Sequence, residues 1–319
     1  MAIQVKQGKA FEYACLLCFY NTLKDNQDII IEGTSSYHVA KDFYDNLDIK
    51  IKQKLILAAN AAVRVILRLE PQLENPLDNI PLILTIQEDA AGIAGDVRDV
   101  LCIRKQNNWE IGISCKHNHS AVKHSRLSPT IDFGKLWFDI PCSKEYFDTI
   151  NPLFDELRQM KEKKMLWREI EDKDDRFYVP LLNAFVKELK RLDDENTGEV
   201  PKRLLSYLLG TNDFYKVISI ENRKVTNIQA FSVYGTLNRT AGKVRPQVKL
   251  PNLHLPTKFY DISFKPDSKN TILVVADGGW TISMRIHNAS TYVEPSLKFD
   301  VQLIGVPPSL YSHFEPWEI

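Results

Sequence analysis

The chain has 319 residues, which is more than most single hydrophobic cores accommodate, so we expect two or three structural units. Its 44% hydrophobic and 26% charged residues are ordinary for a globular protein, and 41 basic residues balance 41 acidic ones. This balance excludes a uniformly basic nucleic-acid-binding protein, so any DNA-binding surface must be a local patch. Because no apolar run reaches the length of a membrane span, we expect no membrane partner.

The N-terminal segment MAIQVKQGKAFEYACLLCFY is apolar over about the length of a signal peptide. It carries Glu12 within the apolar stretch and lacks a clear cleavage site, so we predict a buried helix over 6–24. Cys15 and Cys18 form a C-x-x-C with no second pair at zinc-ligand spacing, and we interpret them as buried apolar positions. Reduced thiols indicate a cytoplasmic protein.

The next pattern, over 36–70, is helical, with Ser35 and Ser36 as capping candidates. This pattern fits either one long helix or two helices with a break near Asp48. Prolines follow at 71, 76 and 81, and PLILTIQ then predicts a short buried strand. After it we predict a β-hairpin over 99–116.

The elements predicted after residue 120 are first helical and then β-rich. We predict the start of a helix over 120–127, a loop at DFGKLWFDIPCS, and charged helices over 143–175 and 177–196. After residue 211 the segments are β-branched, aromatic and alternating, which is typical of strands. The fold class is therefore α/β (α+β), with a mixed central sheet flanked by helices and a β-rich C-terminal region.

The hairpin GDVRDVLCIRKQNNWEIGISCKH contains the main functional signal. With the turn at residues 106–108, antiparallel pairing sets Asp99 beside Cys115 or Lys116, and Ser114 shares the face of Lys116. A metal-dependent phosphodiester nuclease needs such a carboxylate to hold a divalent cation and a lysine to stabilise developing charge. Mg²⁺ suits hard oxygen ligands and few protein groups. The alternative is a surface ion pair at a strand end.

A second carboxylate is less certain from the pattern. Glu110 lies on the same face of the predicted strand as Ser114, but ~13 Å away along it. It therefore reaches the same metal only if Gly112 marks a bulge. Glu12 is the other catalytic and metal-ligand candidate, because an unpaired buried carboxylate is costly. The alternative for Glu12 is exposure to solvent or pairing with Lys9. Asp96 and Glu88 are weaker candidates.

Three basic segments are candidates for DNA binding. KHNHSAVKHSRLS supplies Lys123, His124 and Arg126, and its three histidines also leave zinc binding by His117, His119 and His124 as an alternative. NRTAGKVRPQVKLP supplies a basic loop, and a later strand adds Arg285 and His287. A solvated loop and an ordinary exposed strand face are the alternatives here. The loop cations are Arg239, Lys243, Arg245 and Lys249.

The hairpin resembles the PD-(D/E)xK nuclease superfamily, with Asp99 as the first acid, Lys116 as the final lysine, and Ser114 where that pattern has its second acid. The stretches GKAFEYA, GDVRDV, WEIGISCKHNHSAVKHSRLS, IDFGKLW and RIHNASTYVEPSLKFDVQL extend the resemblance to the HaeIII-type restriction endonucleases. This resemblance implies a type II enzyme of a restriction-modification system that cuts double-stranded DNA at GGCC with Mg²⁺. A catalytically degenerate DNA-binding protein and a repair or structure-specific nuclease are the competing hypotheses.

The order of the predicted elements suggests how the chain is organised. We expect an N-terminal helical region over 1–80 that packs on the core, a nuclease core with a charged helical layer over 81–210, and a β-rich region for DNA recognition over 211–319. Because a palindrome presents two strands to two active sites, a homodimer is one expectation. A monomer that nicks twice is the other.

Overall fold

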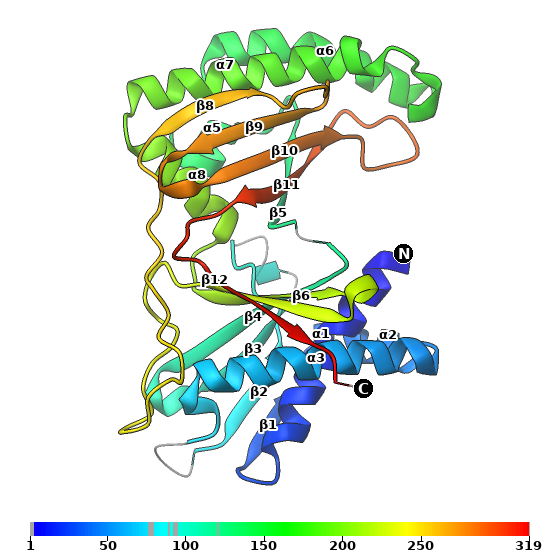
Figure 1. The fold of residues 1–319 in the computed structure, drawn as a ribbon. Coiled ribbons are helices and arrows are strands. Elements are labelled where there is room, and N and C mark those ends of the chain that lie inside the picture. Colours follow the sequence, from blue (N-terminus) through cyan, green and yellow to red (C-terminus); the bar gives the residue numbers. More distant parts are fainter. Residues whose placement is uncertain (1–2, 76–79, 89, 92–94, 120, 319) are drawn as a thin grey trace. The chain divides into compact units, whose positions relative to one another are not determined.

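The computed structural model describes residues 3–75, 80–88, 90–91, 95–119 and 121–318. It divides into two compact units, each with its own sheet and helices (Figure 1). These units differ from the three consecutive regions expected from the sequence, because strands distant in the chain pair with one another. Unit 1 comprises Met1–Ser120, Gly210–Leu253 and Pro308–Ile319, and unit 2 comprises Ala121–Leu209 and His254–Pro307.

Unit 1 is built on a seven-stranded mixed sheet in the order β1-β2-β3-β4-β6-β7-β12. The pairs β1–β2 and β4–β6 are parallel, and the other neighbours are antiparallel. The predicted mixed sheet flanked by helices is therefore confirmed. The strands are β1 (Ile29–Glu32), β2 (Leu82–Ile86), β3 (Val100–Arg104), β4 (Trp109–His117), β6 (Phe214–Ile220), β7 (Val225–Phe231) and β12 (Tyr311–Pro316).

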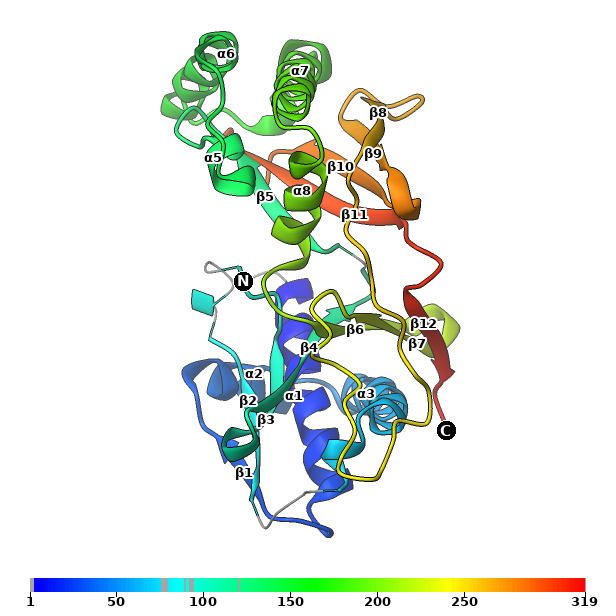
Figure 2. The same ribbon diagram turned by 90° about the vertical axis from the view of Figure 1, so that its left-hand side faces the viewer.

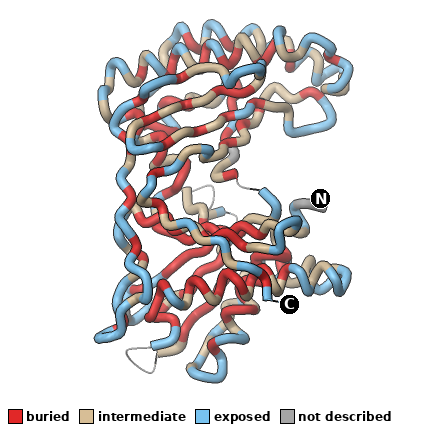
Figure 3. Tube along the Cα trace, viewed as in Figure 1, coloured by how far each residue is buried: buried red, intermediate tan, exposed pale blue. Residues whose placement is uncertain are grey.

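The helices α1 (Ile3–Leu23) and α3 (Ile49–Leu69) pack against the sheet of unit 1 (Figure 2). The small side chains of α3, such as Ala58 and Ala62, lie in the same apolar cluster as Ile113 and Val217 of the strands. Small residues let a helix approach a sheet closely, and the central strands of this sheet are mostly buried (red in Figure 3).

The long helical pattern forms two helices, α2 (Ser35–Asp45) and α3, as the two-helix alternative predicted. Asp48 caps α3 by accepting a hydrogen bond from the Lys50 backbone N at 2.8 Å. The capping prediction for α2 was wrong, because Thr34 caps it through the Tyr37 N at 3.1 Å. The serine hydroxyls at 35 and 36 instead donate to the Glu88 carboxylate at 2.7 and 3.1 Å, which holds Glu88 at the start of this helix.

Unit 2 contains a five-stranded antiparallel sheet in the order β5-β11-β10-β9-β8. One face of it packs on helices through aromatic rings, such as Phe185 and Phe299, whose centroids are 5.2 Å apart. The strands are β5 (Lys123–Leu127), β8 (Phe259–Phe264), β9 (Thr271–Ala276), β10 (Thr281–His287) and β11 (Leu297–Gly305); the helices are α5 (Phe133–Phe138), α6 (Lys144–Glu162), α7 (Val179–Glu195) and α8 (Glu199–Leu209).

Two local predictions in this unit were wrong. Segment 123–127 is the strand β5 rather than the start of a helix, because it pairs with β11, far along the chain. DFGKLW is the short helix α5 rather than a loop, because Asp132 caps it and Phe133 and Trp137 bury its inner face. The charged helix over 143–175 was right only up to Glu162, where α6 ends and short helical turns lead to α7. None of the helices in the described part of the chain combines the length and apolarity needed to cross a membrane.

Candidate active site

The β3–β4 hairpin sets the position of the candidate catalytic aspartate. Val100 pairs with Ile113 and the Asp99 N donates to the Ile113 carbonyl at 2.8 Å, so Asp99 stands opposite Ser114. The predicted register was therefore wrong by one or two residues. The turn begins at Lys105, in a short helical turn that ends at Asn108 with a positive φ of 46°, and is one residue longer than expected.

Asp99 and Lys116 nevertheless meet in space. Asp99 Oδ2 accepts hydrogen bonds from the Cys115 N at 2.7 Å, from the Lys116 Nζ at 3.3 Å and from the Ser114 Oγ at 3.4 Å. Burial alone would lower the pKa of Lys116, but the carboxylates of Asp99 and Glu12 outweigh it and hold that pKa above its ordinary value. Lys116 is therefore a charged ammonium that lies against a carboxylate.

Helix α1 brings Glu12 to the same place. Its start lies over the end of β4, with the rings of Phe11 and His117 6.1 Å apart. Glu12 is only 7% exposed and forms an ion pair with Lys9 at 3.2 Å. Burial raises the pKa of Glu12 to about 8, the Asp99 carboxylate adds to the rise, and Lys9 and Lys116 oppose it. Both features expected from the sequence therefore occur together: Glu12 is buried, and it pairs with Lys9.

The two carboxylates fit a divalent cation. Glu12 Oε2 is buried with the Lys9 ammonium 3.2 Å away, and the charge of Glu12 is still disfavoured by both burial and Asp99. A cation would relieve both costs, and Mg²⁺ is held by one or two carboxylates with several waters. The zinc alternative of His117, His119 and His124 is not tested, because the side chain of His124 lies outside what the structure describes.

The histidines after Lys116 have other partners. His117 Nδ1 lies 2.7 Å from the Ser219 Oγ and its Nε2 lies 3.0 Å from the Asn118 side-chain amide, and burial lowers the pKa of its imidazole. His117 therefore helps to fix the end of β4 to β6. The side chain of His124 lies outside what the structure describes.

The structure does not bring Glu110 to this site. Glu110 pairs with Ile103 in a β3–β4 register that runs through Gly112 without a bulge. The side chain of Arg98 covers Gly112, where an added Cβ would come within 2.0 Å of the Arg98 Cδ. Arg98 binds Glu110 at 2.7 Å and Asp96 at 2.7 Å, so these two acids neutralise a buried guanidinium. The bulge needed for Glu110 is excluded by this packing.

Sequence reasoning missed Lys216 of β6. It pairs with Ser114 across the parallel β4–β6 ladder and is only 3% exposed. Burial, and then the charge of Lys116, lower its pKa to about 7. The signal was a lysine inside the apolar strand FYKVISI, but its place beside Ser114 depends on a long-range strand pairing.

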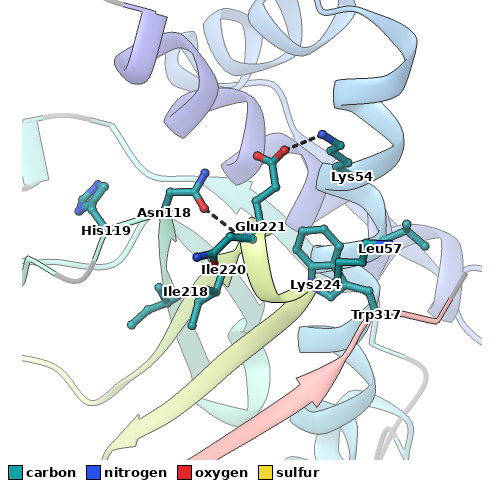
Figure 4. Close-up of a pocket in the computed structure, with 10 residues that line it drawn as sticks. Lys54, Leu57, Asn118, His119, Ile218, Ile220, Glu221, Lys224 and Trp317 are labelled. Atoms are coloured by element: carbon teal, nitrogen blue, oxygen red, sulfur yellow. Dashed lines mark hydrogen bonds and ion pairs between the residues drawn. The ribbon is translucent and has the colours of Figure 1, made fainter.

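A cavity of about 930 Å³ begins next to the candidate active site, since Ile218 in its wall pairs with Lys116 (Figure 4). Ile220, Leu57 and Trp317 contribute apolar surface. Polar groups lie beside it, where Lys54 pairs with Glu221 at 2.6 Å and the Asn118 Oδ1 accepts from the Glu221 N. The site therefore adjoins an open apolar depression of unit 1.

In unit 2 the open sheet face carries a basic group that we call the basic face, defined as Arg126, Arg285, His287 and Lys298. Adjacent strands bring these residues together, because Arg126 pairs with Lys298 and Lys298 pairs with His287. The charge of Arg126 contributes, after burial, to lowering the pKa of Lys298. Asp300 partly offsets the face through an ion pair with Arg285 at 3.3 Å. Lys298 was missed by the sequence analysis.

Lys123 lies on the opposite face of this sheet. Its ammonium lies 3.6 Å from the centroid of the Tyr207 ring and donates to the Tyr207 carbonyl at 2.8 Å, and burial lowers its pKa to about 8. Successive side chains of a strand point to opposite faces of the sheet, so residues 123 and 126 lie on different faces. The structure therefore turns Lys123 toward the helices, whereas Arg126 is exposed.

This contrast makes a matched pair of variants. We expect Lys123→Ala to lower the free energy of unfolding by about 1–2 kcal/mol, through loss of a desolvated cation–π contact and a hydrogen bond, with little change in DNA affinity. Arg126→Ala should lower DNA affinity with little change in stability. Urea titration and gel-shift assays on both proteins check this, and the reverse pattern would exclude the assignment of the two faces.

The basic loop of unit 1 is exposed at its cations and anchored at its base. Asn238 binds the carbonyls of Leu69 and Val248 at 2.8 and 3.0 Å, and its N donates to Glu70. Burial raises the pKa of Glu70 to about 7, while hydrogen bonds from Tyr215 and Asn238 oppose the rise. The cations on this anchored loop are Arg239, Lys243, Arg245 and Lys249.

Comparison with known proteins gives the family of the chain. The family model described as HaeIII restriction endonuclease matches residues 8–307. The curated type II restriction enzyme HaeIII of Haemophilus aegyptius is 46% identical over 311 residues, which cover 98% of this chain and 97% of that protein. No solved structure gave a significant match. The matched region includes Glu12, Asp99 and Lys116.

Proposed function

Because the chain belongs to the HaeIII restriction endonuclease family, we propose that it is a type II restriction endonuclease that cuts both strands of double-stranded DNA. The contact between Lys116 Nζ and Asp99 Oδ2 carries this proposal, since it joins a metal-binding carboxylate to a charge-stabilising lysine. The GGCC target is proposed only from the resemblance to the family, and it does not rest on any contact in the structure. The arrangement supports a PD-(D/E)xK-type site with Ser114 in place of the second acid.

In the proposed mechanism Asp99 and Glu12 would hold a Mg²⁺ ion, and the bound ion would supply Lewis-acid chemistry and an activated water. Lys116 donates hydrogen bonds to the phosphate as negative charge develops on its oxygens. Ser114 keeps Asp99 oriented through its hydroxyl. Glu12, on α1, supplies the charge that Ser114 cannot, which favours an active enzyme over a degenerate binding protein.

A plasmid digest with Mg²⁺ tests this function. Discrete fragments that end at GGCC would support the proposal. Gel shifts without cutting would favour a degenerate DNA-binding protein. Cutting confined to branched DNA would favour a structure-specific nuclease. EDTA should stop the reaction, and Mg²⁺ should restore it.

For DNA binding we propose the basic loop of unit 1 and the basic face of unit 2, with His124 kept as a candidate. Lys123 is better explained as a structural residue. Because the target is palindromic, we propose that a homodimer places one active site at each strand. Sedimentation of the protein with one duplex tests this, since one chain per duplex would indicate sequential nicking by a monomer.

The loop proposal gives a binding prediction. Arg245→Glu should lower DNA affinity roughly 10-fold and make the slope of log affinity against log salt less negative by about 1–2, because phosphate contacts release counterions. Fluorescence anisotropy at several salt concentrations measures both. The control Lys190→Glu makes the same charge change at an exposed position of α7. Equal effects of the two variants would count against the loop.

A further inference from the structure

One side chain, that of Asn238, connects both ends of the basic loop of unit 1. Its Nδ2 donates to the carbonyls of Leu69 and Val248 at 2.8 and 3.0 Å, and its Oδ1 accepts from the Leu250 N at 2.9 Å. Leu69 is the last residue of α3, whereas Val248 and Leu250 lie at the far end of the loop. The amide of Asn238 therefore joins the start of the loop, its end and a helix of the core.

The backbone of Asn238 is fixed as firmly as its side chain. Its φ of 62° lies in the left-handed region, which asparagine tolerates better than most residues. Its N–H donates at 2.6 Å to the carboxylate of Glu70, which is fully buried and also accepts from the Tyr215 hydroxyl at 2.6 Å. The core of unit 1 thus sets where the basic loop begins.

Two more hydrogen bonds hold the middle of the loop against the end of α3. Gln72 Nε2, in the short turn after this helix, donates to the Thr240 carbonyl at 3.1 Å. The Gln247 N donates to the Arg68 carbonyl at 2.9 Å. These contacts explain how a loop with exposed cations keeps one shape.

The loop encloses a pocket of about 410 Å³. Leu237 and Leu250, both buried, line it together with the exposed cations Arg245 and Lys249, and none of the described lining residues is acidic. Asn238 is itself part of the lining. Positive charge without a nearby acid suits a DNA phosphate, and cations held in place before binding lose less conformational entropy when it binds.

We propose that Asn238 is a positioning residue for DNA binding, which acts through Arg245 and Lys249 by holding the basic loop in one shape before DNA binds. The inference rests on the proposed DNA-binding role of this loop. Without the three hydrogen bonds of the Asn238 side chain, the loop would have to become ordered on the DNA, and this ordering would weaken binding.

The test is Asn238→Gly, because glycine adopts a positive φ freely and the change removes only the side-chain hydrogen bonds. Asn108→Gly is the matched control, since Asn108 is exposed in the hairpin turn and has a φ of 46°. DNA affinity is measured by fluorescence anisotropy with Ca²⁺, and single-turnover cleavage is measured with Mg²⁺ at saturating DNA. We expect Asn238→Gly to lower affinity about 10-fold. Its cleavage rate at saturation should stay within about threefold of the wild type, because the active site is unchanged.

A double-mutant cycle with Arg245→Glu tests whether Asn238 acts through the loop cations. In the wild-type background this charge reversal should lower affinity roughly 10-fold, whereas in the Asn238→Gly background it should lower affinity only about twofold. The control background, Asn108→Gly, should leave the effect of Arg245→Glu unchanged. Losses that simply multiply in the Asn238→Gly background would overturn the inference.

The outcomes separate the inference from the proposed function. If the wild-type protein does not bind DNA, both fail. If it binds without cutting, the nuclease function fails and the affinities still decide the inference. Wild-type affinity in Asn238→Gly would overturn the inference alone, and a lower thermal midpoint with that affinity would show a purely structural role. If the glycine variant does not fold, Asn238→Asp, which keeps the acceptor and loses both donors, is measured by the same criteria.

Discussion

Replacing Asp99 by alanine should abolish DNA cleavage, with a loss of about 10³-fold or more, because the variant loses both a metal ligand and the acceptor that orients Lys116. Lys116→Ala should cause a loss of similar size, since it removes the ammonium that lies 3.3 Å from Asp99. Single-turnover cleavage of a labelled duplex with Mg²⁺ measures both. The folded state should persist, because the two groups lie at the end of the hairpin and keep partial exposure.

DNA binding separates this explanation from general damage. Gel shifts with Ca²⁺ in place of Mg²⁺ should show affinities within about threefold of the wild type for both variants, because the proposed DNA-contacting cations are elsewhere. Full cleavage activity in either variant would remove the site assignment. Loss of binding in step with loss of cleavage would indicate misfolding instead.

Glu12→Gln should lower cleavage by about 10²-fold or more and weaken divalent-ion binding, because it removes one of the two carboxylates proposed to hold the ion. Isothermal titration with Mn²⁺ measures the second effect without catalysis. The amide keeps the shape of the side chain, so packing of α1 against β4 should be preserved. Wild-type affinity for the ion in this variant would exclude Glu12 as a ligand.

The same variant has a signature in metal-free protein. Burial raises the folded-state pKa of Glu12 from 4.5 to about 8, so the unfolded chain releases this proton at lower pH than the folded one. Metal-free wild type should therefore lose stability as pH rises from about 4.5 to 8, whereas Glu12→Gln should lose less over that window. Urea unfolding with EDTA at several pH values compares the two proteins.

Glu110→Gln is the matched control for both measurements. It makes the same chemical change on β4, but Glu110 pairs with Arg98 rather than with the candidate metal site. We expect nearly wild-type cleavage and ion affinity, with a loss of stability of about 1 kcal/mol from the weakened pair. An effect on ion affinity as large as that of Glu12→Gln would return Glu110 to the site.

The sequence by itself determined the elements whose signals are local. Alternation on both sides of a polar turn predicted the hairpin, and its parity was enough to bring Asp99 and Lys116 together despite a shifted register. One charge in the apolar stretch AFEYACLLCFY singled out Glu12, because burial of an unpaired carboxylate is costly wherever the helix packs. The resemblance across the chain identified the family, which the comparisons confirm.

Only the tertiary structure decided what depends on pairing between distant segments. β6 lies about a hundred residues from β4, so the place of Lys216 beside Ser114 has no local signal. β5 looked helical because its pairing partner, β11, follows much later, and that pairing also turned Lys123 inward and Arg126 outward. The Arg98 side chain over Gly112 excluded the bulge that Glu110 needed. Strand order and side-chain packing are properties of the folded chain, because they arise from contacts that no short window of sequence contains.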